Sequence, residues 1–160
     1  ILLNKQSNSK FLFITKDDPI LIFKKAKSKN IPIEKLLIKS SSRELMPSYI
    51  SLSDFSIFFI MPVFSKKASS PTKMGEIMNM GIPVICNSGV GDVDQIMNES
   101  MPELLIKKFT VDEYERVVNK ILNTKTINKL QIISKSHEYY SLERGIEKYN
   151  TVYEKVLNTN

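Results

Sequence analysis

The chain has 160 residues, of which 42% are hydrophobic and 25% are charged, and its formal net charge is +6. These values fit one globular domain with a hydrophobic core, and no apolar run approaches the roughly 20 residues of a membrane-spanning helix. Cys86 and His137 are the only cysteine and histidine, which excludes an intrachain disulfide and leaves too few ligands for a protein-only zinc site.

Much of the basic surplus lies near the N-terminus, where Lys24, Lys25, Lys27 and Lys29 share one predicted helix. Basic surfaces attract nucleic acids through long-range fields. No arginine-rich patch with interleaved aromatic residues accompanies these lysines. We therefore interpret them as a solvated helix face and expect no nucleic-acid partner.

Five short apolar runs predict strands: the first has the pattern of a strand buried on both faces, and the third and fourth are expected to be buried as well. In chain order they cover residues 11–15, 36–38, 56–60, 83–86 and 104–106.

Helices are predicted between and after these strands. Asp17-Asp18-Pro19 opens the first, Ser41 has capping-box spacing to Glu44 in the second, and Asp92 is placed to cap a later one. The set covers about residues 19–29, 41–52, 72–80, 93–97, 111–122 and 126–157, with a break near Ser141 in the last.

Strand and helix alternation of this kind is typical of right-handed βαβ units and a parallel sheet. We predict one α/β domain over residues 1–160, with a Rossmann-like parallel sheet flanked by helices and a helical C-terminal segment from about residue 110. In such sheets, ligands bind beyond the carboxyl ends of the strands. The polar segments expected to meet there are residues 15–16, 39–41, 61–72 and 87–92.

The most informative segment runs from Ser69 to Glu76 and continues to Ile85. It predicts a loop, a helix start, a short helix, a glycine stop at Gly81 and a buried strand. A helix start offers N–H groups and a positive dipole end, which suit a phosphate. Lys73 is placed to pair with a diphosphate, and Glu76, about one turn further, to accept hydrogen bonds from sugar hydroxyls.

Ordinary capping of a helix by Ser-Pro is the alternative for this segment. In the same way, Lys73 could be a solvated charge, and Glu76 an acid favoured by the helix dipole.

The chain from Phe11 to about Leu122 resembles the C-terminal, donor-binding half of retaining GT-B glycosyltransferases of the group 1, or family 4-like, kind. The specific match is residues 69–85, with a Glu-bearing helix followed by Gly-x-Pro-Val-Ile. Residues 41–60 and 87–92 are consistent with it.

The resemblance implies that Glu76 is the second acid of a Glu-x7-Glu pair and binds the donor ribose. Lys39 would lie near the base, and residues 70–73 would face the diphosphate and sugar, with Lys73 as a diphosphate stabiliser. The implied donor-binding residues are Lys39, Ser69, Ser70, Pro71, Thr72, Lys73, Glu76 and Gly89.

The resemblance further implies a UDP-sugar donor, or a GDP-sugar, with no cofactor and no metal. It implies a role in polysaccharide biosynthesis, and it allows a peripheral association of the whole protein with a membrane. The single cysteine fits a reducing compartment, so we expect a cytoplasmic protein.

Two departures from the family pattern stand out. The first acid of the pair would fall at position 68, where this chain has Ala68. The chain also begins at Ile1 inside the expected first helix. We therefore expect that the first strand with its basic loop, and the N-terminal acceptor domain, lie outside this sequence and that this fragment alone is inactive.

Two other functions stay open. One is a noncatalytic nucleotide-sugar-binding module. The other is a nucleotide-sugar epimerase, which needs acid–base side chains and has only Asp92, Asp94 and His137 to offer. His137 lacks motif context, so we place it on a helix surface or in helix packing, and we expect no nucleophilic pair with Cys86.

Overall fold

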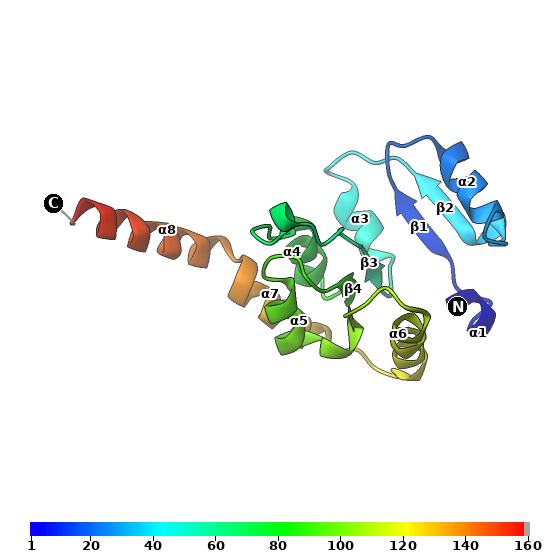
Figure 1. Cartoon of the computed structure of the whole chain (residues 1–160). Helices are drawn as coiled ribbons and strands as arrows, with labels where there is room; N and C mark the ends of the chain where they lie inside the picture. The colour runs from blue at the N-terminus through cyan, green and yellow to red at the C-terminus, as the bar shows by residue number, and fades with distance from the viewer. Residues whose placement is uncertain (159–160) are drawn as a thin grey trace. The chain divides into compact units, whose positions relative to one another are not determined.

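The structure is a computed structural model that describes residues 1–158. It is an α/β protein in which every strand pair is parallel and helices flank the short sheets, consistent with the Rossmann-like α/β class (Figure 1). The contacts group the chain into two compact units, Ile1–Tyr49 and a second that begins at Ile50. The prediction of one domain is not tested by this grouping.

The first unit contains a two-stranded parallel sheet. Its elements are α1 (Leu2–Lys5), β1 (Phe11–Ile14), α2 (Pro19–Lys27), η1 (Ile33–Lys35), β2 (Leu36–Lys39) and the start of α3 (Met46–Ser51), which crosses into the second unit. α2 begins as predicted, because the Asp18 side chain accepts a hydrogen bond from the Ile20 N–H at 2.9 Å.

Two local predictions for the first unit are wrong. The capping box does not form: Ser41 Oγ donates to the Ser42 carbonyl instead, and α3 begins only at Met46. β1 is not buried on both faces, since Phe13 is exposed and the rest of the strand is only partly buried.

The second unit holds a three-stranded parallel sheet in the order β3-β4-β5. Its elements after α3 are β3 (Ser56–Ile57), η2 (Phe64–Lys66), α4 (Thr72–Asn79), β4 (Val84–Asn87), α5 (Val93–Ser100), η3 (Pro102–Leu104), β5 (Leu105–Ile106), α6 (Val111–Asn123), α7 (Lys129–Tyr140) and α8 (Leu142–Leu157). All five predicted strands are therefore present, but they form two sheets rather than one.

β4 is the centre of the second unit, and all four of its residues are buried. Ser56 of β3 lies opposite Val84, and Leu105 of β5 lies opposite Cys86. A central parallel strand is covered on both faces, which explains its nearly continuous apolar sequence. β3 is an edge strand of only two residues, Ser56–Ile57, and Ile57 is 46% exposed, so the prediction of a long buried strand over residues 56–60 is wrong.

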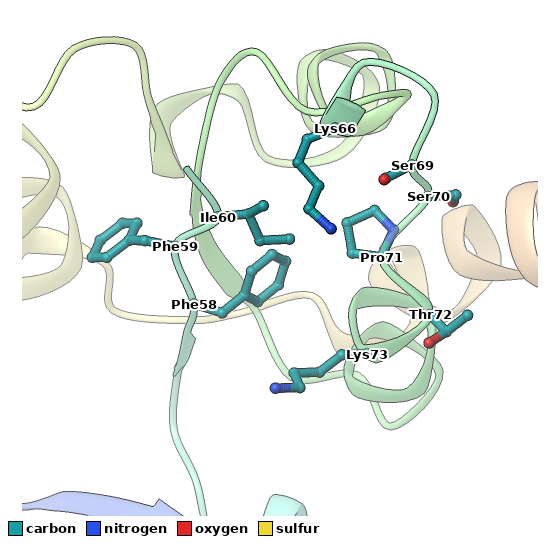
Figure 2. A pocket seen from close by; sticks show the side chains of 9 residues that line it. All are labelled: Phe58, Phe59, Ile60, Lys66, Ser69, Ser70, Pro71, Thr72 and Lys73. Carbon is teal, nitrogen blue, oxygen red and sulfur yellow. The ribbon is translucent and has the colours of Figure 1, made fainter. Parts of the chain in front are cut away.

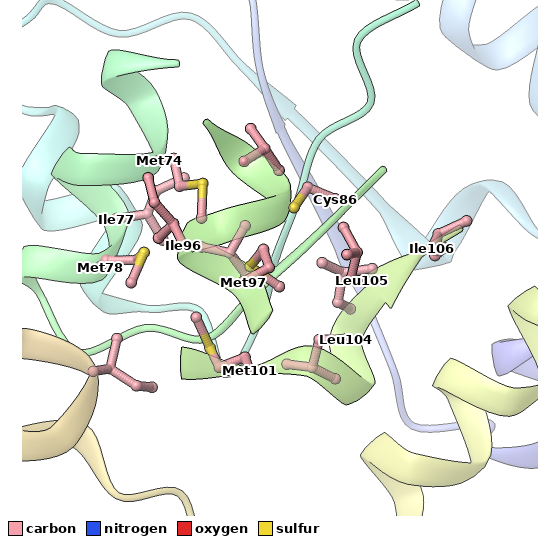
Figure 3. Close-up of a cluster of buried hydrophobic side chains, with 14 of the residues drawn as sticks. Met74, Ile77, Met78, Cys86, Ile96, Met97, Met101, Leu104, Leu105 and Ile106 are labelled. Atoms are coloured by element: carbon pink, nitrogen blue, oxygen red, sulfur yellow. The ribbon is translucent and has the colours of Figure 1, made fainter. Parts of the chain in front are cut away.

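The helices α4 and α5 contribute side chains to the same hydrophobic core as β4, and their buried residues have the same spacing (Figure 3). Each presents buried residues at i, i+3 and i+4, which places them on one helical face. They are Met74, Ile77 and Met78 in α4, and Val93, Ile96 and Met97 in α5. The turn after α4 has the predicted glycine stop, because Gly81 has a φ of +69° that side chains rarely adopt.

α6 is attached to β5 by one arginine. Arg116 donates to the carbonyls of Glu103 and Leu105 and to the Glu113 carboxylate. These hydrogen bonds from Arg116, followed by one from the Lys107 N–H, lower the pKa of Glu113 to about 2. Arg116 thus satisfies carbonyls before and within β5 and orients α6 beside them.

α7 packs against α4 and α5, and the chain then bends at Ser141 as predicted. Ser141 caps α8 by accepting a hydrogen bond from the Arg144 N–H. α8 contains no buried residue and leads away from the rest of the second unit (Figure 1). No helix among the described residues is both long and apolar enough to cross a membrane.

The packing of α7 on α4 requires Gly75. A Cβ at this position would lie 2.6 Å from Cγ of Tyr140, whereas a Cβ on Gly145 of α8 would meet nothing within 4 Å. We expect Gly75→Ala to lower the free energy of unfolding by about 1–3 kcal/mol through overpacking. The matched change Gly145→Ala, in an exposed helix, is expected not to lower it. Thermal and urea unfolding of the two variants checks this, and equal effects would contradict the packing role.

Candidate functional site

A cavity of about 350 Å³ lies beyond the carboxyl end of β3, where ligands bind in parallel α/β sheets (Figure 2). One side is formed by residues 58–60, which directly follow β3. The other is formed by Lys66 of η2 and by residues 69–73 at the start of α4. Its volume falls in the range of small-molecule sites, roughly 300–1,000 Å³.

All charged residues that line the cavity are positive. Lys66 and Lys73 line it together with the hydroxyl residues Ser69, Ser70 and Thr72, and none of the lining residues is an aspartate or glutamate. In Figure 2 the two lysine side chains come from different elements, with the Phe58 ring between their ends in this view. Such a lining favours an anionic ligand.

The start of α4 is not capped by a side chain. Its N-cap residue is Pro71, and neither the serines before it nor Thr72 accepts a hydrogen bond from the first turn. Ser70 Oγ instead donates to Asp92 Oδ2 at 2.9 Å. The capping interpretation of Ser-Pro is therefore wrong, and the first-turn N–H groups of α4 have no side-chain oxygen competing with a ligand.

The wall of the cavity is fixed to the loop after β4 by close backbone contact. The Gly91 N–H donates to the Lys66 carbonyl at 3.0 Å. A Cβ on Gly91 would lie 1.6 Å from the Ser69 carbonyl oxygen, and its φ is +44°. Only glycine fits this position without displacing the segment that carries Lys66 and Ser69.

Asn87 makes a second connection that sequence reasoning did not identify. Asn87 is 3% exposed, and its side chain forms two hydrogen bonds with Ile60, accepting from the N–H and donating to the carbonyl, both at 2.8 Å. It thereby extends the pairing of β3 with β4 past the last strand residue. The available signal was a polar residue directly following the buried run Val84–Cys86, since a buried amide needs partners.

The predicted site residues fall into three groups. Five line the cavity together: Ser69, Ser70, Pro71, Thr72 and Lys73. Gly89 lies in the loop after β4, and Glu76 is exposed on α4, but neither lines the cavity. Lys39 is exposed at the end of β2 in the first unit. The roles of Lys39 and Glu76 toward base and ribose stay predictions.

Lys66 and the residues after β3 were not named in advance as site residues. Lys66 lies within the polar segment 61–72 that was expected at the ligand edge, so its position in sequence was the available signal. Phe58 and Phe59 were assigned to a buried strand, yet Phe59 is half exposed and contacts Phe109 edge-to-face, with ring centroids 5.8 Å apart. Ala68, at the position where the first acid was expected, lies between η2 and the start of α4.

The two aspartates of the loop after β4 have different surroundings. Asp94 stabilises the conformation of the loop, because its carboxylate accepts hydrogen bonds from the Gly89 N–H and the Ser88 hydroxyl. Asp92 is the N-cap residue of α5 but makes no capping hydrogen bond, so the prediction that it caps this helix is wrong. Its carboxylate turns to Ser70 instead.

Among the described residues, no group of three or more His, Cys, Asp and Glu is placed to hold a metal ion. His137 is exposed in the last turn of α7, on a helix surface as expected. Comparison of the chain with protein-family models, with curated proteins and with solved structures gives no match. The resemblance noted from the sequence therefore stays a prediction.

Cys86 is expected to be chemically inert in the native protein. It is fully buried in β4, and this burial raises the pKa of its thiol to about 12. Relative to an exposed thiol, the thiolate fraction at pH 8 falls by about three orders of magnitude. We expect labelling by a disulfide reagent at pH 8 to be at least about 100-fold slower than in guanidinium chloride. Fast labelling of the folded protein would contradict this burial.

Proposed function

We propose that this chain is the donor-binding part of a retaining GT-B glycosyltransferase, which transfers a sugar from a nucleotide-diphosphate sugar to an acceptor. The observation that carries the proposal is the cavity at the uncapped start of α4, lined by Lys66 and Lys73 and by no carboxylate. The resemblance of residues 69–85 supplies the nucleotide-sugar class. The acceptor-binding part and the acceptor itself belong to the whole protein.

In this proposal the diphosphate occupies the cavity between the two lysines and the first turn of α4. Two ammonium groups and a helix start each favour negative charge. When the glycosidic bond to the donor breaks, charge develops on the departing nucleoside diphosphate, and preorganised positive groups stabilise that charge. Glu76, exposed on the same helix, would accept hydrogen bonds from the ribose.

A noncatalytic nucleotide-sugar-binding module is the second candidate. The observation that favours it is that no carboxylate lines the cavity. The position directly before the lining residue Ser69 holds Ala68 and not an acid. Intact nucleotide binding by the whole protein, with neither sugar transfer nor donor hydrolysis, would favour this candidate. The epimerase alternative is not supported, because no aspartate, glutamate or histidine lines the cavity.

Calorimetric titration of the chain with UDP, GDP and inorganic pyrophosphate tests the donor site. We expect Lys66→Ala and Lys73→Ala each to weaken binding of all three ligands about tenfold or more, because each removes a charge-assisted hydrogen bond. Glu76→Ala should weaken UDP and GDP binding and leave pyrophosphate binding unchanged, because it removes only the ribose contact.

The control is Lys125→Ala, which removes one exposed positive charge between α6 and α7. If Lys66→Ala and Lys73→Ala change the affinities no more than Lys125→Ala does, the cavity is not the anion site. If pyrophosphate binding falls with Glu76→Ala as much as UDP binding does, the ribose assignment is wrong.

A further inference from the structure

The Ser70 hydroxyl, just before the start of α4, forms its hydrogen bond with a side chain outside that helix. A serine at the N-cap commonly accepts a hydrogen bond from a first-turn N–H group, but the N-cap residue of α4 is Pro71, and Ser70 directly precedes it. Ser70 Oγ instead donates to Asp92 Oδ2, although Ser70 lines the cavity and Asp92 does not. Asp92 therefore contacts a residue of the cavity lining without lining the cavity itself.

The orientation of Ser70 matters because a cap and an anionic ligand use the same N–H groups. A hydroxyl oxygen that caps α4 would occupy the position of a phosphate oxygen. With its hydroxyl committed to Asp92, Ser70 cannot turn onto the helix start without breaking a charge-assisted hydrogen bond.

Asp92 occupies an enclosed position that stability alone does not explain. Its Oδ1 atom is buried and has no hydrogen-bond partner among the described residues. A buried polar atom without a partner costs free energy, so it calls for an explanation. The Tyr140 ring packs on Gly75 of α4. Burial raises the pKa of the Tyr140 hydroxyl to about 12, with further effects from a hydrogen bond with Ser70 and from the Asp92 charge, so the end of α7 lies beside the same two residues.

We propose that Asp92 is a positioning residue for anion binding: it holds Ser70 away from the start of α4 and keeps the first-turn N–H groups open. Gly91, the residue before it, fixes the Lys66 backbone of the same wall. The loop after β4 thus sets the geometry of a site it does not line. This inference rests on the proposed function, because it assumes that the cavity binds a diphosphate.

The direction in which Asp92 substitutions change the affinity for an anion distinguishes a positioning role from a purely electrostatic one. Removing a negative charge near an anion site should strengthen binding if charge alone matters. We expect Asp92→Ala to weaken pyrophosphate and UDP binding about tenfold, and Asp92→Asn, which loses the same charge but keeps an acceptor for Ser70, to restore most of the affinity. Asp112→Asn, on the exposed first turn of α6, is the control for the loss of one charge.

Ser70→Ala completes a double-mutant cycle. If Asp92 acts through Ser70, Asp92→Ala should cause no further loss of affinity in the Ser70→Ala background. Additive losses would overturn the proposed route. Equal or tighter binding by Asp92→Ala would overturn the proposal itself.

Hydrogen exchange of the ligand-free protein gives a readout that does not depend on the ligand. The backbone amides of residues 66–73 should exchange faster in Asp92→Ala than in the native chain, with melting temperatures compared in parallel. If the native chain binds neither UDP nor pyrophosphate, the proposed function fails, while the exchange rates still decide whether Asp92 holds this segment. Unchanged exchange in Asp92→Ala, or in Ser70→Ala if Asp92→Ala does not fold, would overturn the role of Asp92, because both variants remove the Ser70–Asp92 hydrogen bond.

Discussion

The complete burial of β4 is the constraint on which the second unit depends. Four consecutive buried residues require a strand neighbour on each side and apolar helices against them, and β3, β5, α4 and α5 meet this requirement. The last residue of the strand, Asn87, is buried as well, although its side chain is polar. Asn87 must find partners for its amide there, and it finds them on the backbone of Ile60.

From that point the loop after β4 determines the shape of the cavity. The backbone of Gly91 is in direct contact with the backbone of Ser69 and Lys66. The Asp92 carboxylate accepts a hydrogen bond from the Ser70 hydroxyl. Each contact fixes the segment that leads into α4. The cavity is thus a consequence of how two loops pack at one end of a sheet, and its positive lining follows from which residues those loops carry.

The sequence predicted the elements well where periodicity was strong. The helices expected over residues 72–80 and 93–97, the glycine stop at Gly81 and the break near Ser141 are all found. Predictions were poorer for polar side chains that can form hydrogen bonds with several different groups. Ser41, Ser70 and Asp92 all have side chains that cap helices, and none of them caps one here, because each has another partner close by.

The sequence by itself determined the α/β class, the order of the strands along the chain and the position of the helix start at residues 69–73. It did so because apolar spacing and helix boundaries are local properties of the chain. Only the tertiary structure decided that Lys66 lines the same cavity as Lys73 and that Ser70 faces Asp92. The position of Lys66 depends on the hydrogen bond of its carbonyl with the Gly91 N–H, and Ser70 and Asp92 are 22 residues apart. No local pattern specifies which groups from two such separate loops will meet.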